Sequence, residues 1–241
     1  MSAAMIFVSR SCGGLRLTLG TAHATCRVSG ALWLEGERAL VVADLHLEKG
    51  SAFARRGQML PPYDTAETLD RLDGEVAALD PRTVIFLGDS FHDAKGAARL
   101  QAGDAARLRA MTAATRFIWV CGNHDPCAPE GVAGESVAEF TAGPFTFRHI
   151  ARTGAANEIS GHYHPKAVAP TRATSVERPC FVTDARRIVL PAFGAYTGGL
   201  DVRNAALGQL FPRGGRVFLL GRDRLFSFAL AEHRTRQAAL L

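Results

Sequence analysis

Short apolar runs that end in acidic, amide or histidine side chains recur along the first two thirds of the chain. The runs lie at residues 41–43, 84–87 and 117–120, around Phe147, and at residues 158–160. A short continuous apolar run is typical of a strand that is buried in a sheet. The polar side chains therefore fall at strand ends, where α/β sheets commonly bind their ligands.

Two segments between these runs have the apolar spacing of amphipathic helices. Residues 64–79 begin with a capping box of Asp64 and Glu67 and precede an Asp-Pro stop. Their apolar positions are Ala66, Leu69, Leu72, Val76 and Leu79. A second helix is predicted for residues 97–115, although Gly103 weakens it.

The rest of the chain favours strands and loops. Residues 1–38 are expected to form edge β-structure, because residues 15–19 alternate as a half-buried strand does. Further strands are expected at 187–193, 216–221 and 224–229, the last two as a hairpin. We expect a loop at residues 49–62 and a mostly irregular segment at 126–144, because both contain proline and glycine. Residues 1–241 are thus predicted to form one α/β domain, with two sheets packed together and helices outside.

Histidine is concentrated after the strands. The chain has eight histidines, and six follow the apolar runs: His46, His92, His124, His149, His162 and His164. Asp44 and His46 are two positions apart, so their side chains point to the same side. A carboxylate with an imidazole suits a borderline divalent metal such as Mn, Fe or Zn. A lone Asp-x-His is more often a solvated turn. The prediction of a metal site therefore depends on the acidic, amide and histidine side chains at the later strand ends.

The ordered motifs resemble those of a known family. They are Asp44-x-His46, Gly88-Asp89, the Gly-Asn-His-Asp of residues 122–125, His149, and His162-x-His164. This order resembles the calcineurin-like metallophosphoesterases. Residues 44–49, 55–61, 161–165 and 190–199 also resemble the bacterial DNA ligase-associated metallophosphoesterases, the DNA damage response endonucleases. The resemblance implies a four-layer α/β/β/α sandwich and a nuclease that acts in DNA repair.

The same resemblance implies a centre of two divalent metal ions, with Mn favoured and Fe or Zn also compatible. Asp89 would bridge both ions. Asp44, His46 and His164 would complete one site, and Asn123, His149 and His162 the other. Two carboxylates, one amide and four imidazoles form a mixed nitrogen and oxygen ligand set, which such metals accept independently of the resemblance.

Further roles follow the motifs. His124 aligns with the proton donor of the family, and imidazole suits an acid near neutral pH. Asp125 either orients His124 or caps the next turn. Many relatives carry an acid where this chain has His92, so either His92 enters the substrate site or Asp93 takes the supporting role.

Three basic side chains follow the first metal motif. Lys49, Arg55 and Arg56 could hold a phosphate backbone, or they could form a solvated loop face. The net charge of +5 is compatible with a polyanionic partner. Only three basic residues are lysines, so the charge can equally reflect an arginine-rich genome composition.

Composition limits the remaining possibilities. Five cysteines without close pairing fit a reducing cytoplasm, and no apolar run reaches the length of about 18 residues that a membrane helix needs.

The leading hypothesis is a metal-dependent phosphodiesterase or nuclease, with DNA favoured over RNA as substrate. The resemblance also implies association with a DNA ligase and a helicase/nuclease repair set. The alternatives are a phosphodiesterase or phosphomonoesterase for a small nucleotide or phosphorylated metabolite, and a non-catalytic scaffold.

Overall fold

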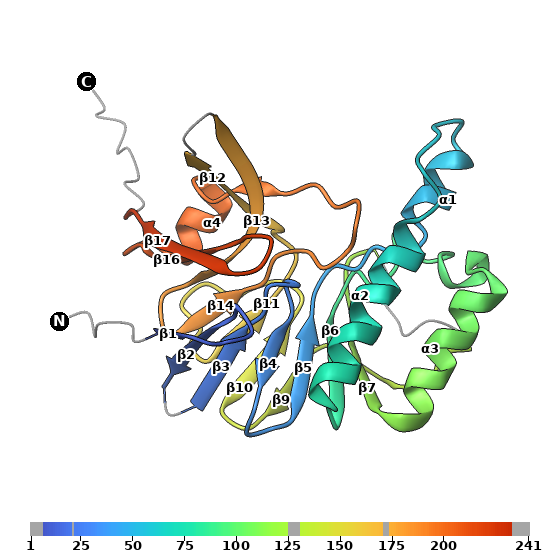
Figure 1. Ribbon diagram of the computed structural model, residues 1–241, viewed down its shortest axis with the longest axis horizontal. Coiled ribbons are helices and arrows are strands. Elements are labelled where there is room, and N and C mark those ends of the chain that lie inside the picture. The colour runs from blue at the N-terminus through green and yellow to red at the C-terminus, as the bar shows by residue number, and fades with distance from the viewer. Residues whose placement is uncertain (1–6, 21, 125–130, 171–173, 233–241) are drawn as a thin grey trace.

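The computed structural model describes residues 7–20, 22–124, 131–170 and 174–232. Two β-sheets lie face to face in these residues, and helices cover their outer faces (Figure 1). This arrangement confirms the predicted α/β fold of the metallophosphoesterase type. The polar ends of the central strands meet at one edge of the sandwich, in the upper half of Figure 1.

The first sheet has eight strands in chain order among the described residues. They are β1 (Phe7–Ser9), β2 (Leu15–Leu19), β3 (Ala22–Cys26), β4 (Leu32–Leu34), β5 (Ala39–Val42), β6 (Thr83–Leu87), β7 (Arg116–Val120) and β8 (Glu135–Val137). Strands β1 to β5 are antiparallel, and β5 to β8 are parallel. In the parallel part Val41 pairs with Ile85, and Ile85 pairs with Ile118, so the three strands end at the same edge.

The second sheet has nine described strands in a mixed order, β15-β12-β13-β14-β11-β10-β9, with the hairpin β16–β17 attached to β13. They are β9 (Phe140–Ala142), β10 (Phe145–Arg148), β11 (Glu158–Ser160), β12 (Pro165–Pro170), β13 (Ser175–Thr183), β14 (Arg187–Val189), β15 (Leu200–Asp201), β16 (Gly215–Leu220) and β17 (Leu225–Leu230). Strands β10, β11 and β14 are parallel. The predicted hairpin at residues 216–229 is confirmed.

The helices complete the layers. They are α1 (Lys49–Ala54), α2 (Asp64–Leu79), the 3₁₀ turn η1 (Ala97–Arg99), α3 (Ala102–Ala114) and α4 (Ala205–Leu210). Helices α2 and α3 pack on the outer face of the first sheet, and α4 packs on the outer face of the second. Helix α1 projects beside the sheet edge (Figure 1). The fourth layer is therefore a single short helix.

Three apolar clusters explain why the central strands are continuously apolar. Val41, Ile85 and Ile118 point between the sheets and meet side chains such as Phe147 and Phe181. Their neighbours along β5, β6 and β7 point to the other face, toward α2 and α3. Because successive side chains of a strand alternate between faces, a strand covered on both sides needs apolar residues at every position.

Two local predictions near the N-terminus of α2 are wrong. Residues 49–62 are not entirely a loop, because Lys49–Ala54 form a helix. Asp64 does not cap α2, since Tyr63 is the N-cap and has no side-chain capping bond. The Asp64 carboxylate instead accepts a hydrogen bond from Gly50 N at 3.0 Å, which joins α1 to α2. A tertiary contact thus replaces the local capping contact.

Other boundaries also differ from the sequence predictions. The helix expected at residues 97–115 is divided by Leu100 and Gln101 into η1 and α3. The irregular segment expected at 126–144 contains β8 and β9, which are short strands at sheet edges. Strands β12 and β13 had not been anticipated. No helix in the described ranges has the length and apolar character to cross a membrane.

Candidate metal centre

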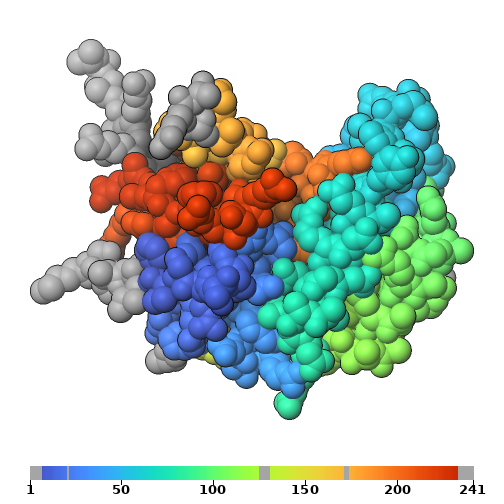
Figure 2. All heavy atoms as spheres, viewed as in Figure 1, coloured from blue at the N-terminus to red at the C-terminus, as the bar shows by residue number. Residues whose placement is uncertain are grey.

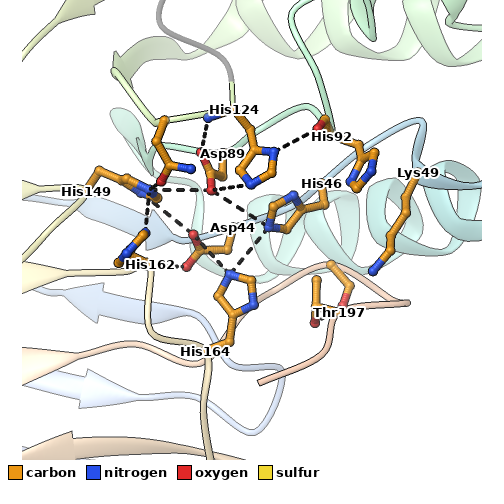
Figure 3. Close-up of polar contacts among 12 residues, drawn as sticks. Asp44, His46, Lys49, Asp89, His92, His124, His149, His162, His164 and Thr197 are labelled. Atoms are coloured by element: carbon orange, nitrogen blue, oxygen red, sulfur yellow. Dashed lines mark hydrogen bonds and ion pairs between the residues drawn. The ribbon is translucent and has the colours of Figure 1, made fainter. Parts of the chain in front are cut away.

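The sandwich brings seven predicted ligands to one edge. Asp44 and His46 follow β5, Asp89 follows β6, and Asn123 follows β7. The second sheet supplies His149 after β10, and His162 and His164 from the connection between β11 and β12. Figure 3 shows the carboxylates and imidazoles of this set converging on a common space. The ligand set therefore draws on both sheets, although it is dispersed over 121 positions from Asp44 to His164.

The first group of ligand atoms belongs to Asp44, His46 and His164, and all lie within 4.8 Å of one another. The Nε2 atoms of His46 and His164 are 3.4 Å apart. His164 Nε2 is also 3.4 Å from Asp44 Oδ1. Two imidazoles and one carboxylate thus face one point.

The second group consists of Asp89, His149 and His162, again within 4.8 Å. His149 Nε2 lies 2.8 Å from Asn123 Oδ1, 3.1 Å from His162 Nδ1 and 3.4 Å from Asp89 Oδ2. Asp89 Oδ2 is 3.9 Å from His46 Nε2 in the first group. The carboxylate of Asp89 therefore lies between the two groups, as expected of a bridging ligand.

The backbone of the centre is unusual. Asp44, His46, Asp89, His162 and His164 all have positive φ angles, between 43° and 72°. Residues other than glycine rarely adopt this region, and such strain concentrates at functional sites. Flanking hydrogen bonds hold these turns, because His46 N donates to Asp89 O at 2.9 Å and His162 N donates to Asp44 Oδ2 at 2.8 Å. The fold therefore imposes these conformations on the ligands.

Two glycines allow the ligand segments to approach closely. A Cβ at Gly88 would lie 2.5 Å from His149 Nδ1, and one at Gly161 would lie 2.6 Å from Asp44 Oδ2. Gly88 also has a φ of 78°. Any side chain at either position would displace a ligand, so the glycine in each motif is a packing requirement.

The atoms present fit divalent cations. His149 Nδ1 lies 2.8 Å from Leu87 O and can donate its proton to that carbonyl, which leaves the lone pair of Nε2 directed toward the centre. If His149 Nε2 carried a proton instead, it could donate a hydrogen bond to only one of its three neighbouring ligand atoms. Asp44 Oδ1 is buried and accepts no hydrogen bond from the described residues. A buried carboxylate oxygen without a donor requires a cation nearby, because isolated charge is costly to bury.

Electrostatics within the cluster support this interpretation. Burial, together with His164, lowers the pKa of His46 to about 3. Burial and the neighbouring His149 also lower the pKa of His162. Burial opposes protonation of His149, but its contact with Asp89 and the charge of Asp44 outweigh that effect and raise the pKa. His46 and His162 are thus kept in the neutral form that binds metal, and the raised pKa of His149 reflects the negative charge of Asp44 and Asp89, which also favours a cation.

His124 and His92 lie beside the two groups (Figure 3). His124 Nδ1 donates to the backbone carbonyl of His92 at 3.0 Å, and His124 Nε2 is 3.9 Å from Asp89 Oδ2. The His92 ring packs against the rings of His46 and His124. Asp125 lies outside the described residues. His92 therefore faces the site and also orients His124 through its main chain.

Asp93 points elsewhere. Its carboxylate accepts two hydrogen bonds from Arg99, at 2.8 and 2.9 Å. Arg99 Nε also donates to Ser51 Oγ at 2.9 Å, which fastens α1 to the loop that follows β6. Of the two possibilities left by the sequence, this geometry favours His92 in the substrate site. The sequence offered no signal for Arg99, since η1 has no recognisable motif.

The three predicted phosphate-binding side chains are divided between two places. Lys49 Nζ donates to Tyr196 O at 2.7 Å, close to Thr197 and the first ligand group (Figure 3). Arg55 and Arg56 are exposed and line an open hollow of about 450 Å³ with Lys95 and Arg99. Figure 2 shows a separate, broader depression between the segment of α1 and strands β12 and β13, and neither of these strands lines the hollow of Arg55 and Arg56.

The fold and the paired ligand groups define a metallophosphoesterase. The model of the calcineurin-like phosphoesterase family matches residues 37–168, and the chain belongs to this family. It is therefore a hydrolase of phosphate esters.

Two solved structures are similar to this chain. The nuclease MPE of Pseudomonas putida has 27% sequence identity and a TM-score of 0.69, over 88% of this chain and 100% of that one. The phosphoesterase Yfce of E. coli has 12% identity and a TM-score of 0.41, over 80% and 98% of the two chains. No curated protein matched the sequence.

Proposed function

We propose that this protein is a metal-dependent nuclease that hydrolyses phosphodiester bonds in DNA during repair. The observation that carries the proposal is the pair of ligand groups joined by Asp89. The similarity to a nuclease over the whole length of that protein supports a nucleic-acid substrate. The resemblance of residues 44–49, 55–61, 161–165 and 190–199 to ligase-associated enzymes supports the role in repair.

In this proposal, two divalent ions occupy the centre, with Mn favoured over Fe or Zn. Asp44, His46 and His164 hold one ion, and Asn123, His149 and His162 hold the other. Asp89 is shared between them. When bound, such a pair activates a water and neutralises charge on the attacking and leaving oxygens of the phosphate.

His124 is the proposed general acid. Its Nδ1–H is held by the His92 carbonyl, so Nε2 is directed toward the centre and can donate a proton to the departing oxygen. Such a role needs the imidazolium form, since Nδ1 retains its own proton. The His92 ring, only partly buried, lies where it can contact the substrate.

Arg55 and Arg56 are proposed to bind phosphates next to the scissile one. Burial lowers the pKa of His92, and the charges of Lys49 and, to a smaller extent, Arg56 add to this effect, so both basic side chains lie near that histidine. Lys95 and Arg99 line the same hollow, and only Asp93 among its lining residues is acidic. Lys49 approaches the centre from the Tyr196 side, where it can contact a phosphate oxygen directly.

The test is a comparison of substrates with purified, Mn-loaded protein. Plasmid DNA, single-stranded DNA, RNA and a mononucleotide are assayed beside bis-p-nitrophenyl phosphate and p-nitrophenyl phosphate, with Asp89→Asn as the control for contaminating nucleases. We expect DNA cleavage, and faster hydrolysis of the diester than of the monoester. Cleavage of the mononucleotide alone would replace this proposal with the small-nucleotide hypothesis, and no hydrolysis at all would favour a scaffold.

The role in repair has a separate test. A strain that lacks the protein should be more sensitive to DNA-damaging agents, and the parent gene should restore resistance whereas Asp89→Asn should not. Co-purification from the cytoplasmic fraction with a DNA ligase or a helicase would support the proposed association. A fully resistant deletion strain would remove the repair role and leave the enzymatic proposal intact.

A further inference from the structure

A second open hollow adjoins the metal centre on the side of His149. It measures about 340 Å³ and is lined in part by Asn123, His149, Ile150, Arg152 and Glu139. Because Asn123 and His149 are proposed metal ligands, the hollow opens directly from the second ligand group. Figure 3 shows His149 on the opposite side of Asp89 from Lys49. The metal centre is therefore flanked by one hollow at α1 and another beyond His149.

The walls of this hollow carry two kinds of exposed group. The side chain of Arg152 is 66% exposed, and Ile150 is 47% exposed. A cation that can reach a phosphate thus lies two positions from an apolar side chain that can pack against a sugar or a base. The volume of the hollow is at the lower end of the range of roughly 300–1,000 Å³ for small-molecule sites, which is enough for one nucleotide.

We propose that this hollow binds the nucleotide next to the scissile phosphate, with Arg152 on its phosphate and Ile150 against its sugar or base. The inference rests on the proposed nuclease function. It adds a contact on the side of the centre that Lys49, Arg55 and Arg56 do not reach. A strand held on both sides would pass over the metal centre instead of ending there.

The structure keeps the Arg152 backbone fixed and its guanidinium available. Arg152 N donates to the carboxylate of Glu158 at 3.0 and 3.2 Å, and that carboxylate is fully buried. Glu158 also accepts from Arg148 Nη1 at 2.9 Å, and the Arg148 side chain is only 15% exposed. Arg148 is therefore a fixed part of the wall, whereas Arg152 can turn toward a ligand.

Glu139 competes for the same guanidinium. Its Oε2 lies 3.1 Å from Arg152 Nη2 and 2.8 Å from Arg148 Nε, and its side chain is 44% exposed. Exposed ion pairs contribute little to stability, so a phosphate can replace Glu139 as the partner of Arg152. The carboxylate also repels any phosphate that enters. Removing the charge of Glu139 should thus strengthen the binding of an oligonucleotide, whereas removing that of Arg152 should weaken it.

The experiment measures kcat and KM on a short single-stranded oligonucleotide with Mn, and on bis-p-nitrophenyl phosphate. For Arg152→Ala we expect the ratio of oligonucleotide to diester kcat/KM to fall about tenfold, mainly through KM, since charge-assisted hydrogen bonds at exposed sites are worth about that much. Arg152→Lys should retain part of the ratio. Glu139→Gln should raise the ratio, because the repulsion is removed while the side-chain shape remains.

The matched controls come from a remote ion pair. Arg16 and Glu35 lie on β2 and beside β4, with their charged atoms 3.7 Å apart, so Arg16→Ala and Glu35→Gln make the same charge changes away from the site. Ratios for Arg152→Ala and Glu139→Gln that equal those of the controls would overturn the inference and leave the nuclease function standing. If the parent hydrolyses the diester but cuts no oligonucleotide, both proposals fall. Should Arg152→Ala fail to fold, Glu139→Gln still decides the outcome.

Discussion

A single carboxylate links the two halves of the site. Asp89 Oδ2 lies 3.4 Å from His149 Nε2 and 3.9 Å from His46 Nε2. Its Oδ1 accepts a hydrogen bond from His124 N at 2.9 Å. Burial raises the pKa of Asp89, but the contacts with His149 and His124 outweigh this effect, so the group is ionised across the physiological range. Asp44 also approaches both groups, with Oδ1 3.4 Å from His164 Nε2 and 3.7 Å from His149 Nδ1, but its second contact is with the nitrogen that faces the Leu87 carbonyl.

We therefore expect Asp89→Asn to lose turnover and at least one metal ion per chain. The amide keeps the size of the side chain and removes the charge that would bridge two cations. Metal content is measured by elemental analysis after loading with Mn, beside activity on bis-p-nitrophenyl phosphate. Two bound ions together with parental activity in Asp89→Asn would contradict the bridging role.

His124 gives the second prediction at this scale. His124→Ala should retain metal but lower turnover by about a hundredfold or more on substrates with a poor leaving group, the usual contribution of general acid catalysis. The loss should be much smaller with p-nitrophenyl esters, whose leaving group needs little protonation. An equal loss with both kinds of leaving group would argue against the acid role.

The Asp93–Arg99 pair allows a prediction about pH. Hydrogen bonds from Arg99 hold the pKa of Asp93 below its ordinary value of 3.8. In the unfolded chain the carboxylate protonates more readily, so the pair stabilises the fold above that value, and its contribution is lost as pH falls through the lower folded pKa. Asp93→Asn should thus be less stable than the parent near pH 7, and the two should converge in acid.

Denaturant unfolding at a series of pH values measures this difference. Asp201→Asn is a second case of the same effect, since hydrogen bonds from Arg203 also hold the pKa of Asp201 below its ordinary value, at a place remote from α1. A stability difference for Asp93→Asn that stays constant from neutral pH to below pH 3 would show that the charge of Asp93 is irrelevant to the fold.

At the scale of elements, the sequence predicts a strand correctly where packing on both of its faces requires apolar residues at every position. Strands β5, β6 and β7 were predicted because burial between two layers demands continuous apolar residues. Helix α1 was missed because it has six residues and no apolar stripe. Contacts from Arg99 and Asp64 hold it, and neither partner is adjacent in the sequence.

The edge strands were missed for a different reason. Strands β8 and β9 have three residues each, lie in a segment rich in glycine and proline, and are only partly buried. A short strand at an edge gains most of its order from its neighbour, so its own sequence carries little information. The break between η1 and α3 is likewise a tertiary feature, because Arg99 must reach Asp93 and Ser51.

Helix α1 has its own prediction. Arg55→Ala with Arg56→Ala should weaken DNA binding and reduce its dependence on salt, because each phosphate contact releases counterions. The slope of log affinity against log salt should become shallower by up to about two for two lost contacts. Binding is measured on Asp89→Asn, which removes cleavage, with Arg222→Ala as an exposed control on the β16–β17 turn. An unchanged slope would identify the two arginines as an ordinary solvated surface.

At the scale of the whole molecule, the candidate ligands were predictable because each motif consists of residues that are neighbours in the sequence. The fold then brings the separate motifs together. Asp44-x-His46 and His162-x-His164 each lie within three residues of sequence. Their surroundings were not predictable. The Arg152–Glu139 hollow joins the start of β9 to the residues after β10, and the basic hollow joins α1 to η1. Long-range contacts of this kind leave no mark on any one segment.

The division of ligands between the sheets leads to the last prediction. Asp44, His46, Asp89 and Asn123 come from the first sheet, and His149, His162 and His164 come from the second. Metal binding should therefore stabilise the sandwich as a whole, by about 2.7 kcal/mol for one site at a hundred times its Kd. For a chain of this size that corresponds to a rise in Tm of roughly 5–10 °C.

Differential scanning calorimetry with Mn and after chelation tests this expectation. Chelation should lower the Tm of the parent, and readdition of Mn should restore it. Asp89→Asn serves as the control, because its Tm should respond far less to either treatment. If the parent Tm is the same with Mn and after chelation, while elemental analysis shows that the ions were bound and then removed, the ions do not join the two sheets. The fold would then hold the ligand geometry without any energetic help from the metal.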